Sequence, residues 1–373
     1  MFARGLRVEV KGPVAMLMDA ESGDVLYEKR GKEKIYPASV TKVATALFVL
    51  QEKRDWVERF ITVSAEALRK RPSNGEGAPW WWYVDGSRMG LLEGEELRVI
   101  DLLHGVLLVS GNDASNAIAE GISCSIPRFM DELNAWLQKM GCNKTHFVNP
   151  HGCHHVDHWT TAYDLCLMMQ EALKSELFCE IASQVSYARP KTNKQGKSVM
   201  KSGNRFLQEK SSVYYPKILA AKTGYHAAAN YVLLAAAEDR GRRLIGCLAG
   251  CAENQDRYQG MIQMFEAAFQ EERRERLLFD EGRTFARKVD GAKKELRAVL
   301  AKNLFFSYFP SQEPEIRLFL SWQVPDFPIE KGAFVGEVQA IDQKGRLVAR
   351  GELRAQERVE ATLLHRCKHL FNR

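Results

Sequence analysis

The chain has 373 residues, of which 45% are hydrophobic and 27% charged, with a formal net charge of +6. This is an ordinary globular composition, long enough for two domains, and no run approaches the roughly 20 apolar residues that span a bilayer. No basic block carries interleaved aromatic residues, so we expect a mixed charged surface and no nucleic-acid partner. The first residues lack the apolar core of a secretory signal, which leaves a cytoplasmic chain and a mature exported chain both open.

Hydrophobic periodicity and turn residues predict the secondary structure in chain order. Strands over 14–19 and 24–28 form a hairpin, and an apolar run over 43–50 behind Pro37 predicts a helix buried on all sides. Residues 70–90, rich in Gly, Pro, Ser and Trp, are expected to form a long loop. Helices are expected over 97–108, 127–140 and 160–175, and another is expected to begin at Asp113 as its N-cap. Strands are expected over 218–222, 231–237 and 244–249, followed by a helix over 255–272.

The composition changes after about Arg283, which predicts a second domain. Short strands are expected over 316–322, 334–341 and 346–353, with prolines between them. We therefore expect a larger domain over 1–280 and a small β domain over 281–358. In the tail over 359–373, apolar residues follow a helical stripe with a basic flank, as in an interfacial membrane helix; packing onto the β domain is an equal alternative.

Three short motifs point to a serine nucleophile, and they occur in the order Ser39-x-x-Lys42, Ser110-Gly-Asn112 and Lys222-Thr-Gly224. Positions three apart on a helix face the same way, so Lys42 can reach the hydroxyl of Ser39. A lysine acts as a base only when it is neutral, which requires desolvation or a second cation such as Lys222. A serine at a helix N-terminus also gains from the helix dipole, which favours developing negative charge.

A second copy of two of these motifs warns that each is weak alone. Ser198-Val-Met-Lys201 is followed directly by Ser202-Gly-Asn204. This copy lacks the apolar helix and lies in a polar stretch, so we interpret it as an exposed hairpin and assign the nucleophile to Ser39.

The third motif ends an apolar strand over 218–221. Glycine at Gly224 is expected to let a substrate backbone approach the strand closely. An extended peptide would then pair along this strand as along a sheet edge.

With these residues the sequence resembles the low-molecular-mass penicillin-binding proteins of the D-alanyl-D-alanine carboxypeptidase type, whose superfamily carries the same motif set. The resemblance covers nearly the whole chain, including the phrases Pro37-Ala-Ser-Val-Thr-Lys42, Thr145-His-Phe-Val-Asn-Pro-His-Gly152 and Phe334-Val-Gly-Glu-Val338. It implies an α+β fold in which helices and an all-helical subregion flank an antiparallel sheet, as in β-lactamases and transpeptidases. A small C-terminal domain resembling a β-sandwich is implied as well.

The resemblance also implies a role for each catalytic residue. Ser39 attacks the carbonyl between two D-alanines and Lys42 takes its proton. Backbone N–H groups of Ser39 and Tyr225 form the oxyanion hole, usually among the largest catalytic contributions. Ser110 relays a proton to the departing D-alanine, and Asn112 orients the side chains and the substrate amide.

Substrate binding is implied for residues 222–225. Lys222 shares the proton relay and, with Thr223, binds the terminal carboxylate. Gly224 and Tyr225 continue the strand along which the substrate peptide binds. The implied partners are peptidoglycan stem peptides and β-lactam antibiotics, with a peripheral membrane contact, no cofactor and no metal. The implied location is the periplasm or cell envelope, at the outer face of the cytoplasmic membrane.

The sequence departs from this family at several positions. The family often has a carboxylate-binding arginine downstream of the third motif, and the stretch over 250–257, which ends at Arg257, does not place it securely. Cys153 stands where an aliphatic residue is common. Four histidines crowd the same loop together with Cys153 and suggest a metal site, but we favour a metal-free loop: His151, His154, His155 and His158. Trp80–Trp82 and Tyr83 either line the rim of the site or pack on the core.

Other functions remain open at this point. A serine β-lactamase shares the three motifs, but its deacylating glutamate is replaced by Met130 in the nearest matching phrase, Met130-Asp-Glu-Leu-Asn134. A transpeptidase or endopeptidase differs only in the shape of its cleft. A non-catalytic penicillin sensor or wall-binding module is disfavoured by the intact Ser39 and Lys42.

Overall fold

The computed structural model describes residues 5–70 and 83–364 and divides into two compact units. Among the described residues, the larger unit lies within 6–270, and the smaller unit comprises residues 271–364 together with residue 5. The division therefore falls earlier than the expected residue 280. The physical reason is that β10 (Arg274–Phe279) pairs antiparallel with β13 (Leu304–Tyr308) of the smaller unit.

The centre of the larger unit is a five-stranded antiparallel sheet in the order β2-β1-β9-β8-β7. Its strands are β1 (Val14–Asp19), β2 (Val25–Lys29), β7 (Ile218–His226), β8 (Asn230–Asp239) and β9 (Arg242–Cys251). The expected strands are confirmed, with β7 and β8 several residues longer than the apolar runs. Strand β7 lies at one edge of the sheet, with the motif 222–224 in its second half.

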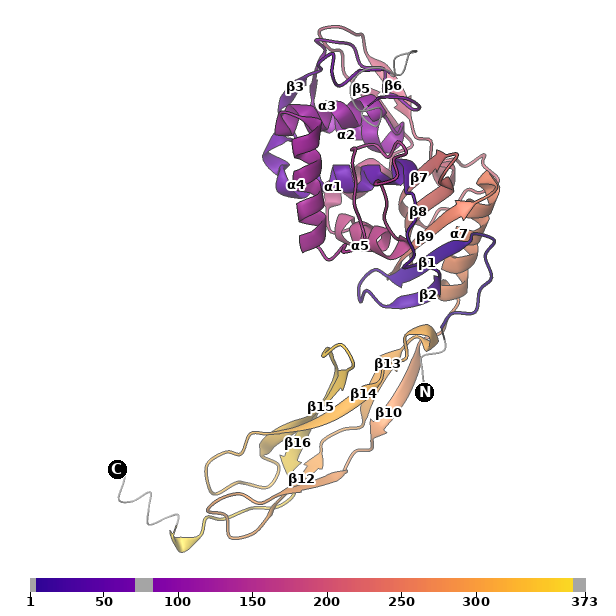
Figure 1. The fold of residues 1–373 in the computed structure, drawn as a ribbon. Helices are drawn as coiled ribbons and strands as arrows, with labels where there is room; N and C mark the ends of the chain where they lie inside the picture. Colours follow the sequence, from indigo (N-terminus) through magenta and orange to yellow (C-terminus); the bar gives the residue numbers. More distant parts are fainter. Residues whose placement is uncertain (1–4, 71–82, 365–373) are drawn as a thin grey trace. The chain divides into compact units, whose positions relative to one another are not determined.

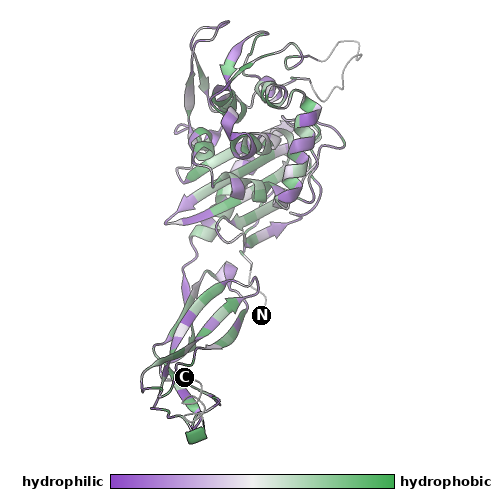
Figure 2. Ribbon diagram, turned by 90° about the vertical axis from the view of Figure 1, so that its left-hand side faces the viewer, coloured by the Kyte–Doolittle hydropathy of each residue, from purple (hydrophilic) through white to green (hydrophobic). Residues whose placement is uncertain are grey.

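Both faces of this sheet are buried, which explains the continuous apolar runs of its central strands. In β1, Met16 and Met18 belong to the core on one face, while Ala15 and Leu17 belong to the core on the other. Figure 2 shows the hydrophobic colouring running through the strands and the helix faces that cover them.

Helices cover the two faces of the sheet unequally (Figure 1). Helix α7 packs against β8 and β9 on one face, whereas α5 packs against β1 and β9 together with α1 and the helical subregion. The helices are α1 (Lys42–Glu52), α2 (Val99–Leu108), α3 (Asn112–Ser123), α4 (Ile126–Lys139), α5 (Ala162–Ala172), α6 (Glu176–Ser183) and α7 (Asn254–Phe269). These confirm the expected helices, and α1 is buried along its length from Lys42 to Leu50.

Two small two-stranded antiparallel sheets border the helical subregion. One pairs β3 (Phe60–Thr62) with β4 (Glu96–Arg98), and the other pairs β5 (Ser186–Arg189) with β6 (Ser198–Lys201). The second is the exposed hairpin expected for the duplicated motif. A 3-10 turn, η4 (Arg205–Leu207), follows it.

The prediction that Asp113 is an N-cap is wrong. Helix α3 begins at Asn112 with Gly111 as its N-cap, so Asp113 lies inside the first turn. Its carboxylate instead accepts hydrogen bonds from the backbone N–H groups of Met89, Gly90 and Leu91 at 2.8, 2.8 and 3.1 Å. Asp113 therefore anchors residues 89–91 to the helix carrying Asn112.

The smaller unit combines a five-stranded antiparallel sheet, in the order β11-β12-β16-β15-β14, with the two-stranded sheet of β10 and β13. The five strands are β11 (Thr284–Arg287), β12 (Leu296–Leu300), β14 (Ile316–Trp322), β15 (Phe334–Asp342) and β16 (Leu347–Ala355). Its core includes Leu304 of β13 with Leu300 and Leu353 of the larger sheet. Strands β10 to β13 were not expected from the sequence, because their apolar runs are short.

Several sequence-based expectations fall on residues outside the described ranges. These are the Trp80–Trp82 rim and most of the amphipathic tail over 359–373. Of the adjoining residues, Tyr83 is buried, and Val359 pairs with Ile329 in the smaller unit. Within the described ranges, none of the helices has the length and apolar character needed to cross a membrane.

Candidate active site

A tight turn presents Ser39 at the head of helix α1. Residues of η1 (Ala38–Thr41) run directly into α1, and Ala38 adopts a left-handed conformation with φ of 48°. Gly224 of β7 lies against this turn, so that a Cβ there would be 2.7 Å from the Pro37 carbonyl oxygen and 3.0 Å from the Ser39 nitrogen. The glycine therefore admits the chain's own nucleophile turn beside the strand, where we had expected it to admit a substrate.

Lys42 is fully buried one helical turn after Ser39. Its Nζ donates to the Ser39 hydroxyl at 3.0 Å, to Asn112 Oδ1 at 2.6 Å and to the His151 carbonyl at 2.7 Å. Burial lowers the pKa of Lys42 from its ordinary 10.5 to about 7. Lys42 can therefore exist as a neutral amine near neutral pH while it is held within hydrogen-bonding distance of the serine.

Ser110 and Lys222 form a second polar pair beside Ser39 and Lys42, joining the helical side of the site to strand β7. Ser110 lies between α2 and α3 with a left-handed φ of 59°, and Lys222 Nζ donates to its hydroxyl at 2.9 Å and to the Thr223 carbonyl at 3.0 Å. Burial, together with the nearby charges of Lys42 and Arg257, lowers the pKa of Lys222 well below its ordinary value. This pair can accept and return a proton at the serine hydroxyl.

Asn112 connects Lys42 to the chain segments around Asp85 and Cys153. Besides its bond from Lys42, its Nδ2 donates to the Asp85 carbonyl and lies 3.6 Å from the Cys153 sulfur. Burial raises the pKa of the Cys153 thiol, so the group is held as the neutral thiol beside the lysine.

A pocket of about 520 Å³ contains the groups on which this chemistry depends. It is lined by Ser39, Ser110 and Asn112 on the helical side and by residues 223–226 of the edge strand β7 on the other. The structure thus brings together the eight residues singled out from the sequence, with Lys42 and Lys222 directly behind the lining hydroxyls.

Arg257 is the residue that sequence reasoning could not place. It lies in α7 and is buried, yet it lines the same pocket, and its Nη1 donates to the carbonyls of Gly224 and Val232 at 2.8 Å each. Its Nε has no hydrogen-bond partner among the described residues. The guanidinium can therefore meet an anion in the pocket. Its position at the end of the 250–257 stretch was the only sequence signal.

The histidine-rich loop supports the site through its backbone and through packing. The His151 carbonyl holds Lys42, while His158 Nε2 lies 2.8 Å from the Thr41 hydroxyl. At Gly152, where φ is 92°, a Cβ would overlap the Ala38 carbonyl, so glycine is required for the loop to meet the nucleophile turn. Across the described ranges, no group of three or more His, Cys, Asp or Glu side chains could hold a metal ion.

Comparison with known proteins agrees with this geometry. A family model described as D-alanyl-D-alanine carboxypeptidase matches residues 4–252, and the chain belongs to this family. The carboxypeptidase DacF of Bacillus subtilis is 32% identical over 256 residues, which is 68% of this chain and 61% of DacF. DacD of Salmonella typhimurium is 27% identical over 351 residues, which is 92% of this chain and 85% of DacD. The chain thus spans less than two thirds of the Bacillus relative and most of the Salmonella one.

Solved structures establish the fold. The D-alanyl-D-alanine carboxypeptidase DacD from Francisella tularensis superposes with a TM-score of 0.66 at 21% identity and covers 97% of each chain. Penicillin binding protein 5 from Haemophilus influenzae superposes with a TM-score of 0.65 at 23% identity, covering 95% of this chain and 99% of that protein. The expected fold class, including the C-terminal β domain, is confirmed.

Proposed function

We propose that this protein is a serine-type D-alanyl-D-alanine carboxypeptidase that removes the terminal D-alanine from peptidoglycan stem peptides. The contact between Lys42 Nζ and the Ser39 hydroxyl, at 3.0 Å on a buried helix, is the observation that carries this proposal. A serine is a weak nucleophile until an adjacent base removes its proton, and the lowered pKa of Lys42 suits that role.

Acylation would proceed between the two walls of the pocket. Ser39 Oγ forms a bond to the carbonyl carbon of the penultimate D-alanine, and its proton passes to neutral Lys42. The negative charge on the carbonyl oxygen would be stabilised by the backbone N–H groups of Ser39 and Tyr225, which the packing of β7 against η1 supports.

The leaving group would depart beside Ser110. The C–N bond breaks as the amine takes a proton from Lys222 through the Ser110 hydroxyl. A water molecule then attacks the Ser39 ester: its proton passes through Ser110 to Lys222, and protonated Lys42 returns its proton to Ser39 Oγ, which releases a carboxylic acid and restores the enzyme. We assign the terminal carboxylate of the substrate to Thr223 and Arg257, because both line the pocket and Arg257 has an unpartnered Nε among the described residues.

Release of D-alanine from a synthetic pentapeptide stem tests the proposal. Mass mapping after penicillin treatment should locate the adduct on Ser39, and Ser39→Ala should lose both the adduct and the release of D-alanine. Ser198→Ala is the matched control, since Ser198 begins the duplicated motif on the exposed hairpin. No D-alanine release by the folded protein, or an adduct on Ser198, would refute the assignment.

A serine β-lactamase is the second candidate. The position of its deacylating glutamate in the nearest matching phrase is occupied by Met130, a residue of α4 that is buried in the core. Without a carboxylate there, the penicilloyl-enzyme is expected to persist, and rapid hydrolysis of penicillin would favour the β-lactamase assignment instead.

The proposed substrate lies in the cell envelope, and we therefore propose that the enzyme acts outside the cytoplasm. The apolar stripe and basic flank of the last eleven residues further suggest contact with an anionic membrane surface, where each Lys or Arg contributes about 1 kcal/mol. Liposome co-sedimentation of the full chain against a chain ending at Thr362 tests this contact, and equal binding would argue against it.

A further inference from the structure

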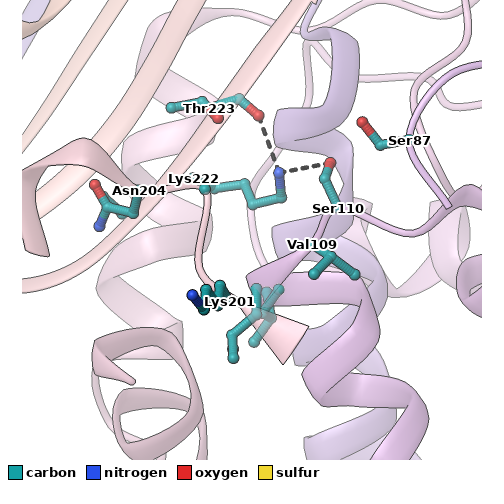
Figure 3. A pocket seen from close by; sticks show the side chains of 11 residues that line it. Ser87, Val109, Ser110, Lys201, Asn204, Lys222 and Thr223 are labelled. Carbon is teal, nitrogen blue, oxygen red and sulfur yellow. Dashed lines mark hydrogen bonds between the residues drawn. The ribbon is translucent and has the colours of Figure 1, made fainter. Parts of the chain in front are cut away.

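A second pocket of about 310 Å³ lies beside the first and shares Ser87, Ser110 and Thr223 with it. Most of its remaining polar lining comes from the duplicated motif of residues 198–204. Lys201 and Asn204 line this pocket together with Lys222, which connects it to the proton relay (Figure 3).

The polar groups of this second pocket are suited to an anion. Asn204 is 6% exposed, and its Oδ1 accepts a hydrogen bond from the Phe206 nitrogen at the start of η4, whereas its buried Nδ2 has no acceptor among the described residues. A buried donor without an acceptor is unfavourable, so a ligand that supplies an acceptor is favoured.

Charge supports the same ligand class. Lys201 has an exposed side chain and no acidic partner in the described part of the chain, and none of the residues lining this pocket is acidic. Lys222 also lies here, with Nζ bonded to Ser110 (Figure 3). The exposed lysine and an amide donor, without a carboxylate in the lining, select against a cation.

Part of the wall of the second pocket is apolar. Leu107 and Leu108 from the end of α2 line it, as does Ala221 of β7. A ligand that fits both the walls and the donors carries an aliphatic stem that ends in a carboxylate.

The position of the second pocket relative to the reaction identifies which part of a substrate would enter it. The pocket is lined by Ser110 and Lys222 but not by Ser39, so it lies on the far side of the proton relay from the nucleophile. A leaving amine that takes its proton at Ser110 would carry its own side chain toward this pocket.

We propose that the second pocket binds an acidic side chain of the departing carboxyl-terminal residue, with Lys201 and Asn204 as its specificity-determining groups. The inference rests on the proposed carboxypeptidase function and names a class of substrate for it: peptides that end in D-Ala-D-Xaa, where Xaa has a methylene stem and a terminal carboxylate, as in D-glutamate.

Acetylated L-Lys-D-Ala-D-Xaa tripeptides with D-Glu, D-Gln, D-Ala or D-Lys at the last position provide the test. For the unmodified enzyme we expect kcat/KM for release of D-Glu to exceed that of D-Lys by at least about tenfold, which corresponds to about 1.4 kcal/mol. A D-Lys peptide cleaved as well as the D-Glu peptide would overturn the inference.

Variants connect this preference to the second pocket. Lys201→Met keeps the stem and removes the charge, and it should reduce the ratio of kcat/KM for D-Glu to that for D-Lys at least about tenfold, back toward unity. Asn204→Asp keeps the oxygen that caps η4 and places a carboxylate in the pocket, so it should reverse the preference. Lys197→Met is the matched control, an exposed lysine of the same hairpin that does not line either pocket, and its ratio should not change.

Binding measured without turnover separates this inference from the proposed function. In Ser39→Ala protein, calorimetry should show tighter binding of the D-Glu tripeptide than of the D-Lys tripeptide, and Lys201→Met should abolish the difference. Absence of release by the unmodified enzyme would refute the carboxypeptidase assignment, whereas equal binding of the two peptides would refute the role of the second pocket. Melting curves exclude unfolded variants, and Lys201→Met, at an exposed side chain, remains decisive if Asn204→Asp does not fold.

Discussion

The protonation state of Lys42 predicts how acylation of Ser39 depends on pH. An ordinary lysine, with a pKa of 10.5, is neutral in about one molecule in 3,000 at pH 7. Burial lowers the pKa of Lys42 to about 7, so about half of the molecules carry a neutral base at that pH. The structure thus raises the concentration of competent base by about three orders of magnitude at neutral pH.

The expected profile follows directly from this pKa. The second-order rate constant for acylation by penicillin should reach a plateau above about pH 8 and fall about tenfold per pH unit below about pH 6. At pH 5 it should be about one hundredth of the plateau. Stopped-flow measurement with a fluorescent penicillin between pH 5 and 9 gives the profile directly, and Ser39→Ala supplies the background.

Two results would refute this reasoning. A rate that continues to rise tenfold per unit through pH 9 would mean that Lys42 titrates like an exposed lysine. A flat rate between pH 5 and 8 would mean that no base with a pKa near 7 takes the serine proton.

The lowered pKa of Lys42 also couples folding to pH. Because the pKa is about 7 in the folded chain and ordinary in the unfolded chain, the unfolded chain binds one more proton between about pH 7 and 10.5. The contribution of Lys42 to stability is therefore complete above pH 10.5 and is lost as the pH falls to about 7. The loss amounts to about 5 kcal/mol, and Lys42→Met should remove this part of the pH dependence in denaturant titrations.

Three further substitutions test the site. Lys42→Arg keeps the positive charge but has no accessible neutral form, so release of D-alanine should fall about 10²- to 10⁴-fold, and near-normal activity of a folded variant would contradict the role of the base. Gly224→Ala would push its Cβ into the nucleophile turn and should slow penicillin acylation at least about tenfold, whereas Gly196→Ala, with open space around its Cα, should not; equal rates would contradict the packing. Arg257→Met should raise KM about tenfold or more for peptides with a free terminal carboxylate and less for their amides, and an unchanged acid-to-amide ratio would exclude Arg257 from carboxylate binding.

Much of the local structure could be predicted from the sequence, because the signals are short-range. The i, i+3 spacing of Ser39 and Lys42 on an apolar helix, and the apolar run before Lys222, follow from helix and strand periodicity. The packing of the helix head against the strand also depends on Gly224, and the reason is visible only in three dimensions. Gly224 accommodates the nucleophile turn, whereas the sequence suggested a substrate there.

The tertiary structure decided which distant groups meet. The partners of Lys42 at Asn112 and His151 lie 70 and 109 residues along the chain, and Arg257 reaches the pocket from a helix on the far face of the sheet. Hydrophobic periodicity reports that a residue is buried, but it does not report the neighbours among which it is buried.

The duplicated motif shows most clearly what the sequence indicates and what only the tertiary packing decides. The sequence correctly indicated that Ser198 belongs to an exposed hairpin. Only the packing of residues 201–204 against the end of α2 placed Lys201 and Asn204 beside the proton relay, through bonds such as that from the Gly203 nitrogen to the Leu108 carbonyl. Pairings of this kind are set by the shape of the assembled core, since no periodic pattern in either segment specifies its partner.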